Sequence, residues 1–437
     1  MPPRSRWPLR RCSTEATTPA RRSTLGRRLP EQPLSIEITF VRHAETHANA
    51  SGVWQGHGNH LLSERGEQQA RALRDRLDGK EFDFVFASDL ARTLQTAELA
   101  GLAATPDPSW REIDIGRWQG LTRDEVDELY PEESAALREG RPVQMGGGES
   151  WDEFSARVSV ALADLIHRTP PGSRVLILTH GGNVHSVVGA GLQVTGRGRT
   201  WPLERVRNAS VTEVIASQEL FHLHSYNDAR HALPEPSGPD TVALVRHGET
   251  VANLEGRWHG TTDGPLSDHG LLQVERFAGS HDGATRIFTS PLERARHTAE
   301  AYARRHRLIA CLEPGLVEID FSAWEGLTTS EIEQTFASEW HSVFEGAADL
   351  PRGGAGETFA GAGLRMDRAI STLARSNPGE RLALFGHGGS IWALAARVLG
   401  LPWPRYRSLG LPTNTSLTRV QLTSDGMRLV DYNLPLR

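Results

Sequence analysis

The chain has 437 residues, of which 38% are hydrophobic and 23% charged, and its net charge is −6. This length exceeds what one hydrophobic core usually supports and predicts two domains. No apolar run approaches the roughly 18 residues of a membrane-spanning helix, and with only Cys12 and Cys311 there is neither a disulfide framework nor a cysteine metal site.

The charge is unevenly distributed along the chain. Residues 1–34 hold eight arginines against Glu15 and Glu31, a balance of +6 that leaves −12 for the rest. An acidic body argues against a nucleic-acid partner. The first 34 residues lack the apolar stretch of a secretory signal, so we expect a disordered, Arg-rich leader, with a transit peptide as the alternative. Lys80 is the only lysine beside 47 arginines, which indicates a G+C-rich genome and favours a bacterial, cytoplasmic protein.

The predicted elements alternate between strand and helix in both halves. In the first half we expect strands at 36–41, 82–87 and 175–179, and helices at 64–77, 90–99, from 151 and at 184–192. In the second half we expect strands at 242–245, 287–289 and 382–385, and helices at 365–375 and 390–399. Such alternation is typical of an α/β sheet. The sequence therefore predicts two tandem three-layer α/β/α domains, residues 35–230 and 240–437, each a mainly parallel sheet with helices on both faces, joined by a Pro-rich linker at 231–239.

One short motif occurs twice, each time directly after a predicted strand. It reads Arg42-His43-Ala44-Glu45-Thr46 and, 204 residues later, Arg246-His247-Gly248-Glu249-Thr250. Each copy is followed in the same order by an Arg, a Glu and a His-Gly-Gly, at offsets of 202, 206 and 207 residues: Arg92 and Arg294, Glu112 and Glu318, His180 and His387. Offsets that drift this little indicate a tandem duplication.

These residue types suit phosphoryl transfer. Histidines that follow strands lie at the carboxyl end of an α/β sheet, where ligands bind. Arginine forks match phosphoryl oxygens, and the Gly-Gly pair begins a helix whose amides face an anion. A neutral imidazole can attack phosphorus, and a carboxyl group can protonate the leaving oxygen. Asp114, Glu125 and Glu325 are alternatives to Glu112 and Glu318 for that last role.

As ordered sets, these motifs resemble those of the histidine phosphatase (phosphoglycerate mutase-like) superfamily. The resemblance implies that His43 and His247 are phosphorylated and that Glu112 and Glu318 donate protons. It also implies a phosphate pocket in each half and no metal or other cofactor. The pocket residues are Arg42, Asn49, Arg92 and His180 in the first half and Arg246, Asn253, Arg294 and His387 in the second.

Two departures separate the halves. Ala44 replaces the usual glycine of the motif, and Asn59-His60-Leu61-Leu62 stands where the second half has Asp263-Gly264-Pro265-Leu266. We expect substrate contacts from loops around 54–62, 122–148, 258–266 and 328–356.

The expected function is hydrolysis of small phosphorylated metabolites, such as sugar phosphates, at two sites. The family's mutases carry a long insertion between the Glu and the second His, and here the gaps are only 68 and 69 residues. A phosphoglycerate mutase-type phosphotransferase and a chain with one non-catalytic binding half remain the alternatives. Neither a nucleic acid nor a membrane is expected as a partner, and the sequence sets no oligomeric state.

Overall fold

The computed structural model describes residues 35–194, 200–232, 240–279 and 283–436. The expected leader at 1–34 and most of the expected linker, 233–239, lie outside these ranges. The elements of the first half are β1 (Ile36–Arg42), α1 (His47–Ala50), α2 (Glu64–Leu77), β2 (Phe84–Ala87), α3 (Ala91–Leu99), β3 (Thr105–Pro106), α4 (Arg123–Leu129), α5 (Pro131–Glu139), α6 (Trp151–Arg168), β4 (Arg174–Thr179), α7 (Gly181–Leu192), β5 (Val211–Ala216) and β6 (Phe221–Asp228).

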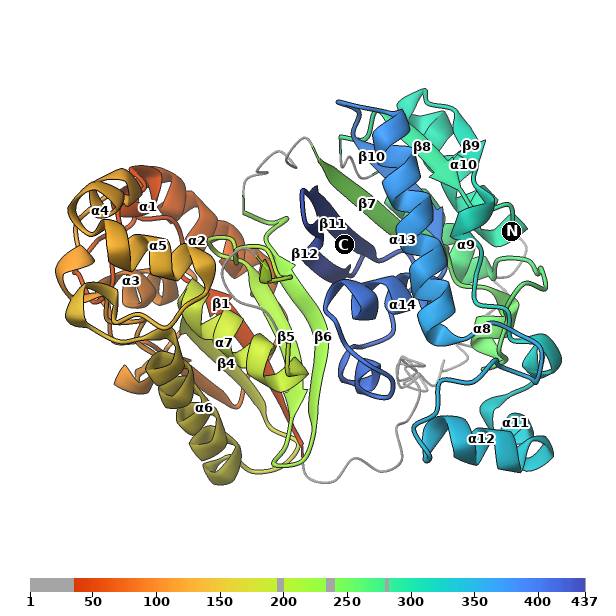
Figure 1. Cartoon of the computed structure of the whole chain (residues 1–437), viewed down its shortest axis with the longest axis horizontal. Coiled ribbons are helices and arrows are strands. Elements are labelled where there is room, and N and C mark those ends of the chain that lie inside the picture. The colour runs from red at the N-terminus through yellow and green to blue at the C-terminus, as the bar shows by residue number, and fades with distance from the viewer. Residues whose placement is uncertain (1–34, 195–199, 233–239, 280–282, 437) are drawn as a thin grey trace, which may run out of the picture. The chain divides into compact units, whose positions relative to one another are not determined.

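The second half repeats this order almost element by element (Figure 1). Its elements are β7 (Thr241–Arg246), α8 (Val251–Leu254), α9 (Asp268–Ala278), β8 (Arg286–Thr289), α10 (Glu293–His306), β9 (Ala310–Leu312), α11 (Thr329–Thr335), α12 (Ala337–Phe344), α13 (Phe359–Ser376), β10 (Leu382–Gly386), α14 (Gly388–Val398), β11 (Leu417–Thr423) and β12 (Gly426–Leu434).

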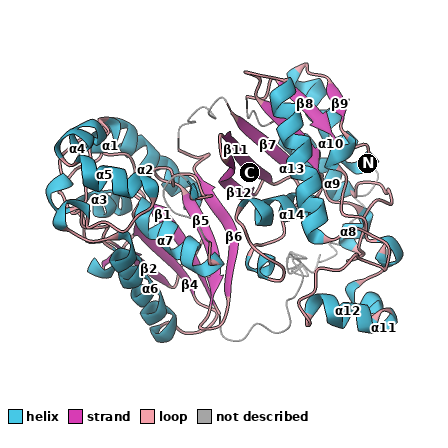
Figure 2. Ribbon diagram, viewed as in Figure 1, coloured by secondary structure: helices cyan, strands magenta, loops and turns pink. Residues whose placement is uncertain are grey.

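Helices cover both faces of the sheet in each half, as the alternation of buried side chains requires (Figure 2). In β4, Val175 and Ile177 belong to the cluster that contains the apolar faces of α6 and α7. The intervening Leu176 and Leu178 pack with residues of α2 and α3. In the second half, alternate residues of β10 are divided in the same way between α13 and α14 on one face and α9 and α10 on the other. The predicted three-layer α/β/α class is confirmed.

The strands form one sheet of twelve, in the order β3-β2-β4-β1-β5-β6-β12-β11-β7-β10-β8-β9. Each half contributes four parallel strands at one outer edge of the sheet, β3-β2-β4-β1 in the first half and β9-β8-β10-β7 in the second. A two-stranded antiparallel hairpin follows toward the middle of the sheet. The hairpins β5–β6 and β11–β12 were not predicted. They meet where Tyr226 pairs with Tyr432, so the sheet continues from one half into the other.

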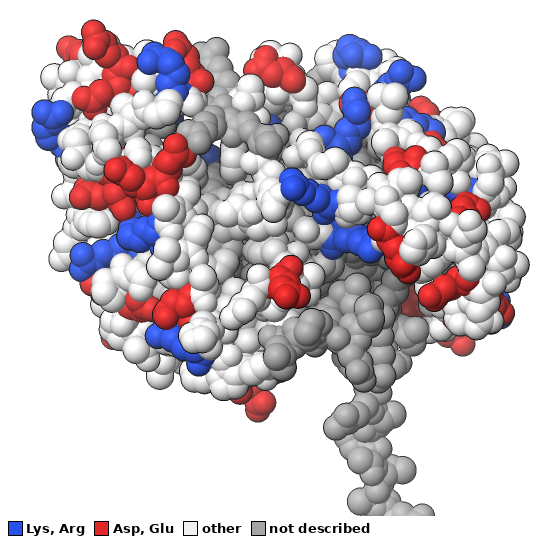
Figure 3. All heavy atoms as spheres, turned by 60° about the horizontal axis from the view of Figure 1, so that its bottom comes forward, with Lys and Arg blue, Asp and Glu red and all other residues white. Residues whose placement is uncertain are grey.

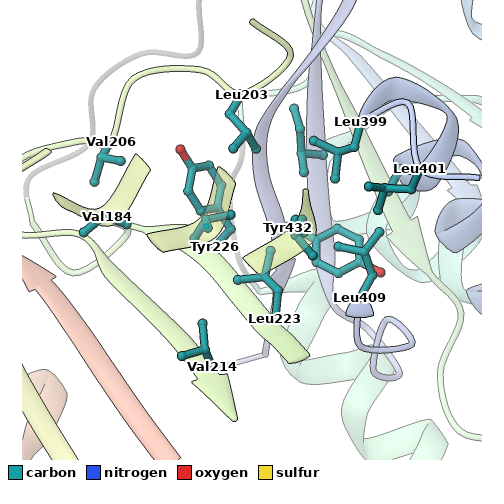
Figure 4. Close-up of a cluster of buried hydrophobic side chains, with 14 of the residues drawn as sticks. Val184, Leu203, Val206, Val214, Leu223, Tyr226, Leu399, Leu401, Leu409 and Tyr432 are labelled. Carbon is teal, nitrogen blue, oxygen red and sulfur yellow. The ribbon is translucent and has the colours of Figure 1, made fainter. Parts of the chain in front are cut away.

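The junction is built symmetrically from equivalent residues. Asn227 donates through Nδ2 to the carbonyl of Val430 at 2.8 Å, and Asn433 donates to the carbonyl of His224 at 2.8 Å. Around the two tyrosines, Leu203 and Leu223 belong to the same buried cluster as Leu399 and Leu409 (Figure 4). The duplicated halves therefore share apolar core as well as backbone pairing.

Two expectations about local structure were wrong. Residues 122–148 and 328–356 were expected as loops, yet each contains two short helices, the first of which starts at a Thr-x-x-Glu capping box. Helices α7 and α14 start at Gly181 and Gly388, so the expected ranges 184–192 and 390–399 begin too late, although the Gly-Gly pair does open each helix as expected.

Candidate active site

Two histidines lie close together at the carboxyl end of the sheet in each half. His43 directly follows β1 and His180 directly follows β4, and these two strands pair in parallel. The centroids of the two imidazoles are 5.2 Å apart. His247 and His387 repeat the arrangement with the same separation of 5.2 Å. The structure thus brings together residues that are more than 130 positions apart in the sequence.

The first histidine of each pair has its ring fixed by a backbone carbonyl. Nδ1 of His43 lies 2.7 Å from the carbonyl oxygen of Ala44, and Nδ1 of His247 lies 2.6 Å from that of Gly248. A carbonyl oxygen only accepts hydrogen bonds, so Nδ1 carries the proton. The lone pair therefore belongs to Nε2.

The surroundings also keep these rings neutral. Burial, followed by the charges of Arg92 and Arg42, lowers the pKa of His43 well below its ordinary value. Burial and the two equivalent arginines lower the pKa of His247 in the same way. A neutral ring with a free Nε2 lone pair is the nucleophilic form of histidine.

An asparagine pair holds the backbone at the first histidine. Asn208 donates through Nδ2 to the carbonyl of His43 at 3.0 Å and to Oδ1 of Asn49 at 3.1 Å. Asn414 makes the same two contacts in the second half, each at 3.1 Å, with Asn253 as its amide partner. Asn49 and Asn253 are thus linked through these amides to the backbone of the histidines. Asn208 and Asn414 were not predicted as site residues.

Arg92 is a buried cation. Only 1% of its surface is exposed, and its guanidinium donates to the carbonyls of Gly56 at 2.8 Å and Gly58 at 3.0 Å, and to Nδ1 of His180 at 3.2 Å. Burial lowers the pKa of Arg92 to about 10, and Glu112 acts in the opposite direction. Within the described part of the chain no carboxylate forms an ion pair with Arg92, so its charge is not neutralised locally.

Arg294 differs from Arg92 in two respects: it has a neighbouring carboxylate, and its Nε makes no hydrogen bond to Nδ1 of His387, whereas Nε of Arg92 donates to Nδ1 of His180. Arg294 is equally buried and donates to the carbonyls of Thr262 at 2.9 Å and Gly260 at 2.6 Å. Its Nη1, however, lies 3.5 Å from Oδ1 of Asp263. The first half has Asn59 at the equivalent position, so the cation of the second half alone has an adjacent carboxylate.

A second arginine precedes the first histidine of each pair. Nη1 of Arg42 donates to the carbonyl of Val206 at 2.5 Å, and Arg246 donates to the carbonyl of Pro412. Their charges lower the pKa of both histidines in their own half. Two arginines and two histidines therefore converge in each half.

The second histidine of each pair is anchored by a serine. Nε2 of His180 lies 2.9 Å from Oγ of Ser88, and Nε2 of His387 lies 2.8 Å from Oγ of Ser290. Both serines directly follow a strand, β2 and β8. Each serine begins a Ser-x-Leu-x-Arg segment, so both could have been found from the sequence. Only the arginine of each segment was predicted as a site residue.

The predicted proton donors lie at the amino end of the helix that follows the second histidine. Glu112 accepts from the amide of Gly182 at 3.2 Å. Glu318 accepts from the amides of Gly389 at 2.9 Å and Ser390 at 2.7 Å. These amides were expected to face a bound anion. The glutamate carboxylate occupies that position in each half, which ties it to the histidine-bearing segment.

The three alternative carboxylates have other partners. Glu125 closes the capping box of α4 with Thr122. Asp114 accepts from the amide of Gly116 at 2.9 Å. Glu325 accepts from the amides of Thr261 at 2.7 Å and Thr262 at 2.8 Å. The geometry therefore favours Glu112 and Glu318 over these alternatives.

An arginine that occurs at equivalent positions of α6 and α13 was missed by the sequence analysis. Arg157 donates to the carbonyls of Arg111 and Glu112, both at 3.2 Å, and pairs with Glu149 at 2.8 Å. Arg365 makes the corresponding contacts with the segment around Glu318. Arg157 and Arg365 are 208 residues apart, as are Glu149 and Glu357. This shared offset is the signal that could have identified the two arginines.

Ala44 is accommodated by a second substitution. A Cβ at Gly248 would lie 2.7 Å from Cγ2 of Val274, closer than packed atoms approach. In the first half the residue equivalent to Val274 is Ala70, and Ala44 packs against it, fully buried. The two halves therefore fill the same space with different residue pairs: Ala44 and Ala70 in the first half, and Gly248 and Val274 in the second.

We expect the substitution Gly248→Ala to lower the free energy of unfolding by about 1–3 kcal/mol through overpacking. Adding Val274→Ala should recover part of this loss, so that a double-mutant cycle in urea denaturation gives a coupling of about 1 kcal/mol. Ala44→Gly with Ala70→Val is the matched cycle in the first half. Strict additivity of the two substitutions would contradict this account.

Neither a metal cluster nor a membrane span occurs in the described ranges. No three His, Cys, Asp or Glu side chains among these residues are placed to hold a metal ion. No helix among them combines the length and the apolar composition that crossing a bilayer requires. Acidic and basic side chains are both scattered over the face drawn in Figure 3.

Both halves of the chain are similar in sequence to known proteins. The sequence model of the histidine phosphatase superfamily (branch 1) matches residues 38–229 and 242–435. The chain is 35% identical over 192 residues to a probable phosphoglycerate mutase of Enterobacter sp. (strain 638), covering 41% of this chain and 84% of the relative. It is 34% identical to phosphoglycerate mutase-like protein 4 of Arabidopsis thaliana, covering 40% and 77%. Among solved structures, a mycobacterial glucosyl-3-phosphoglycerate phosphatase aligns with 29% identity and a TM-score of 0.41, over 45% of this chain and all of that one.

Proposed function

Because the chain belongs to the histidine phosphatase superfamily and carries its domain twice, we propose that it is a phosphomonoesterase with one catalytic site in each half. The substrates are small phosphorylated metabolites, such as sugar phosphates. His43 and His247 are the nucleophiles, and Glu112 and Glu318 are the acid–base groups. Arg42, Asn49, Arg92 and His180 bind the phosphoryl group in the first half, as do Arg246, Asn253, Arg294 and His387 in the second.

The reaction runs in two displacements. Nε2 of His43 attacks phosphorus, the N–P bond forms as the P–O bond to the leaving group breaks, and Glu112 protonates the leaving oxygen. The resulting carboxylate then takes a proton from water, whose oxygen attacks phosphorus and breaks the N–P bond. Phosphate leaves and the neutral imidazole is restored. His247 and Glu318 play these parts in the second half.

The observation that carries the proposal is the fixed, neutral nucleophile beside an unneutralised cation. Nδ1 of His43 is held by the carbonyl of Ala44 at 2.7 Å, so Nε2 is available to react. Arg92 is 1% exposed and has no ion-pair partner in the described ranges. A buried charge of this kind is costly unless an anion approaches it, and a phosphoryl group is such an anion.

Equal geometry in the two halves supports two active sites rather than one active and one silent half. The paired imidazoles are 5.2 Å apart in both, and the Nδ1–carbonyl distances are 2.7 Å and 2.6 Å. Each half therefore has a nucleophile candidate with the same ring orientation.

The proposal is tested by hydrolysis of p-nitrophenyl phosphate in the presence of EDTA. We expect turnover without added metal and a labelled protein that loses its phosphate in acid, as a phosphohistidine does. Turnover that required a divalent metal would contradict the proposal.

The names of two relatives favour a second candidate, a phosphotransferase of the phosphoglycerate mutase type. Such an enzyme returns the phosphoryl group to another hydroxyl of the substrate. Incubation with 3-phosphoglycerate separates the two functions: a mutase yields 2-phosphoglycerate, whereas a phosphatase yields glycerate and inorganic phosphate.

Asp263 should make the second site weaker in binding phosphate than the first. It lies 3.5 Å from Arg294, where the first half has uncharged Asn59. We expect Asp263→Asn to lower the inhibition constant for inorganic phosphate at the second site by roughly three- to tenfold, and Asn59→Asp to raise it at the first site by a similar factor. Inhibition is measured with the other nucleophile replaced by Ala. Asp425→Asn, in the exposed turn between β11 and β12, is the control and should change neither constant.

A further inference from the structure

The first half contains a large cavity that includes none of the residues assigned to its catalytic site. Its volume is about 950 Å³, and it lies among α4, α5, α6, α7 and residues 201–205. This size is sufficient for an organic group as large as a typical drug. The side chains that matter below are Trp118, Ser134, Trp151, His185, Ser186 and Trp201.

In the second half, aromatic side chains fill the equivalent region. Trp403 stacks on Tyr406 with centroids 4.0 Å apart, and it lies 5.5 Å from Phe359 and 5.9 Å from Phe344. Trp340 in turn packs against Phe344 at 4.1 Å. These rings join α12, α13 and the segment that follows α14 into one packed aromatic cluster.

The residues at the equivalent positions of the first half are smaller or more polar. Trp340 corresponds to Ser134 and Phe344 to Arg138, both at the offset of 206 residues that relates α4 and α5 to α11 and α12. Trp392 corresponds to His185, at the offset of 207 that relates the two His-Gly-Gly motifs. All three first-half residues line the cavity. The presence of the cavity in one half and of the aromatic cluster in the other therefore corresponds to substitutions of individual side chains.

Three polar atoms beside the cavity, Oγ of Ser186 and the indole nitrogens of Trp118 and Trp201, have no hydrogen-bond partner among the described residues. They are fully enclosed by protein and do not face the open space. The indole nitrogen of Trp324, the counterpart of Trp118, is unpaired in the second half as well, so these atoms do not distinguish the two halves.

Helix α7 and residues 204–206 connect the cavity to the proposed phosphate pocket. Helix α7 begins directly after His180 and carries His185 and Ser186 into the cavity wall. Nε2 of His185 lies 2.8 Å from the carbonyl of Glu204, two residues before the Val206 carbonyl that accepts from Arg42. The same short segment therefore borders both the cavity and the phosphate-binding arginine.

We propose that this cavity binds the non-phosphate part of the first site's substrate, and that this part is a bulky, flat aromatic group. The inference rests on the proposed function of the first half. Trp151 and Trp201 are partly exposed in the wall, and their indole rings stack on such a group. The second half, with Trp340, Phe344 and Trp403 in place, accepts only compact phosphate monoesters.

The test compares 1-naphthyl phosphate with glycerol 2-phosphate. His247→Ala reports the first half alone, and His43→Ala reports the second. For each half we take kcat/KM for 1-naphthyl phosphate divided by kcat/KM for glycerol 2-phosphate. The two esters differ in intrinsic reactivity, but this difference is the same for both halves and cancels when the two ratios are compared. We expect the ratio to be at least about tenfold higher for the first half, as expected for burial of an aromatic group. Equal ratios would overturn the inference.

A cavity-filling variant locates the effect. Ser134→Trp installs the second half's residue and should lower the first half's ratio toward that of the second. Leu129→Trp, on the exposed side of α4 and outside the cavity, is the matched control and should leave the ratio unchanged.

Binding of 1-naphthol provides a readout that needs no turnover. Titration calorimetry should detect it with the wild-type chain and not with Ser134→Trp, and it should inhibit His247→Ala competitively but not His43→Ala. Failure to bind the wild-type chain would overturn the inference. If neither single variant hydrolysed any ester, the proposed function would fail, and the calorimetry would still decide whether the cavity takes an aromatic ligand.

Discussion

Replacing both His43 and His247 by alanine should reduce hydrolysis of p-nitrophenyl phosphate by at least about 10⁴-fold, the size of effect typical for loss of a covalent nucleophile. Each imidazole is held by Nδ1 at 2.6–2.7 Å from a carbonyl, which leaves Nε2 as the atom that attacks phosphorus. The measurement is steady-state kinetics together with acid-labile phosphate labelling. Both signals should disappear in the double variant.

The single variants separate the two sites. Each should retain the rate of the other half, so that the two rates add to that of the wild-type chain. His341→Ala, at an exposed position, is the control and should keep full activity. Activity that survives in the double variant would refute the mechanism, and a single variant that loses nothing on any substrate of a phosphometabolite panel would identify its half as silent.

Stability should fall steeply as the pH drops below about 6.5. Burial lowers the pKa of four histidines well below the ordinary value: His43, His180, His247 and His387. In the unfolded chain these side chains bind protons near pH 6.5, whereas in the folded chain they stay neutral to lower pH. The unfolded state then holds more protons, so the free energy of unfolding decreases as the pH falls. The limit is about 1.4 kcal/mol per pH unit for each histidine, or about 5.6 kcal/mol per pH unit for all four.

Urea denaturation between pH 7.5 and 5.5, in a buffer without phosphate, measures this slope. His387→Gln removes one titrating group. It should reduce the slope of the free energy of unfolding against pH by the amount that corresponds to one proton, whatever effect the substitution has on the stability at pH 7.5. His341→Gln, which removes an exposed histidine, should leave the slope unchanged. A free energy of unfolding that stayed constant across this range would show that the four imidazoles are protonated in the folded protein.

Much of the candidate site could be predicted because its residues belong to short motifs at strand ends. His43 and His180 follow the predicted strands directly, and a parallel sheet brings such positions together. The repeat supplied a second copy of each motif, so Arg92 and Glu112 could be distinguished from the many other charged residues. The α/β/α layers followed from the alternation of strands and helices.

The unpredicted parts depend on contacts between distant residues. Asn208 was visible only as a landmark of the repeat, and its contact with the carbonyl of His43 depends on how the chain returns after α7. The compensation between Ala44 and Ala70 likewise needs the packing of α2 against the motif. The hairpins β5–β6 and β11–β12 were missed because polar residues interrupt their apolar pattern, and their pairing with each other is tertiary.

The pairing of β6 with β12 bears on why both copies persist. Without its partner, each half would end in an unpaired strand whose backbone groups and whose Tyr226 or Tyr432 would face solvent, a surface that promotes aggregation. Each copy therefore protects the other's solubility, independently of what it catalyses. Selection for a soluble chain would retain both copies even in a lineage where one had stopped turning over substrate. Deleting either half should therefore reduce the amount of folded protein in the cell more than replacing the nucleophilic histidine of that half does.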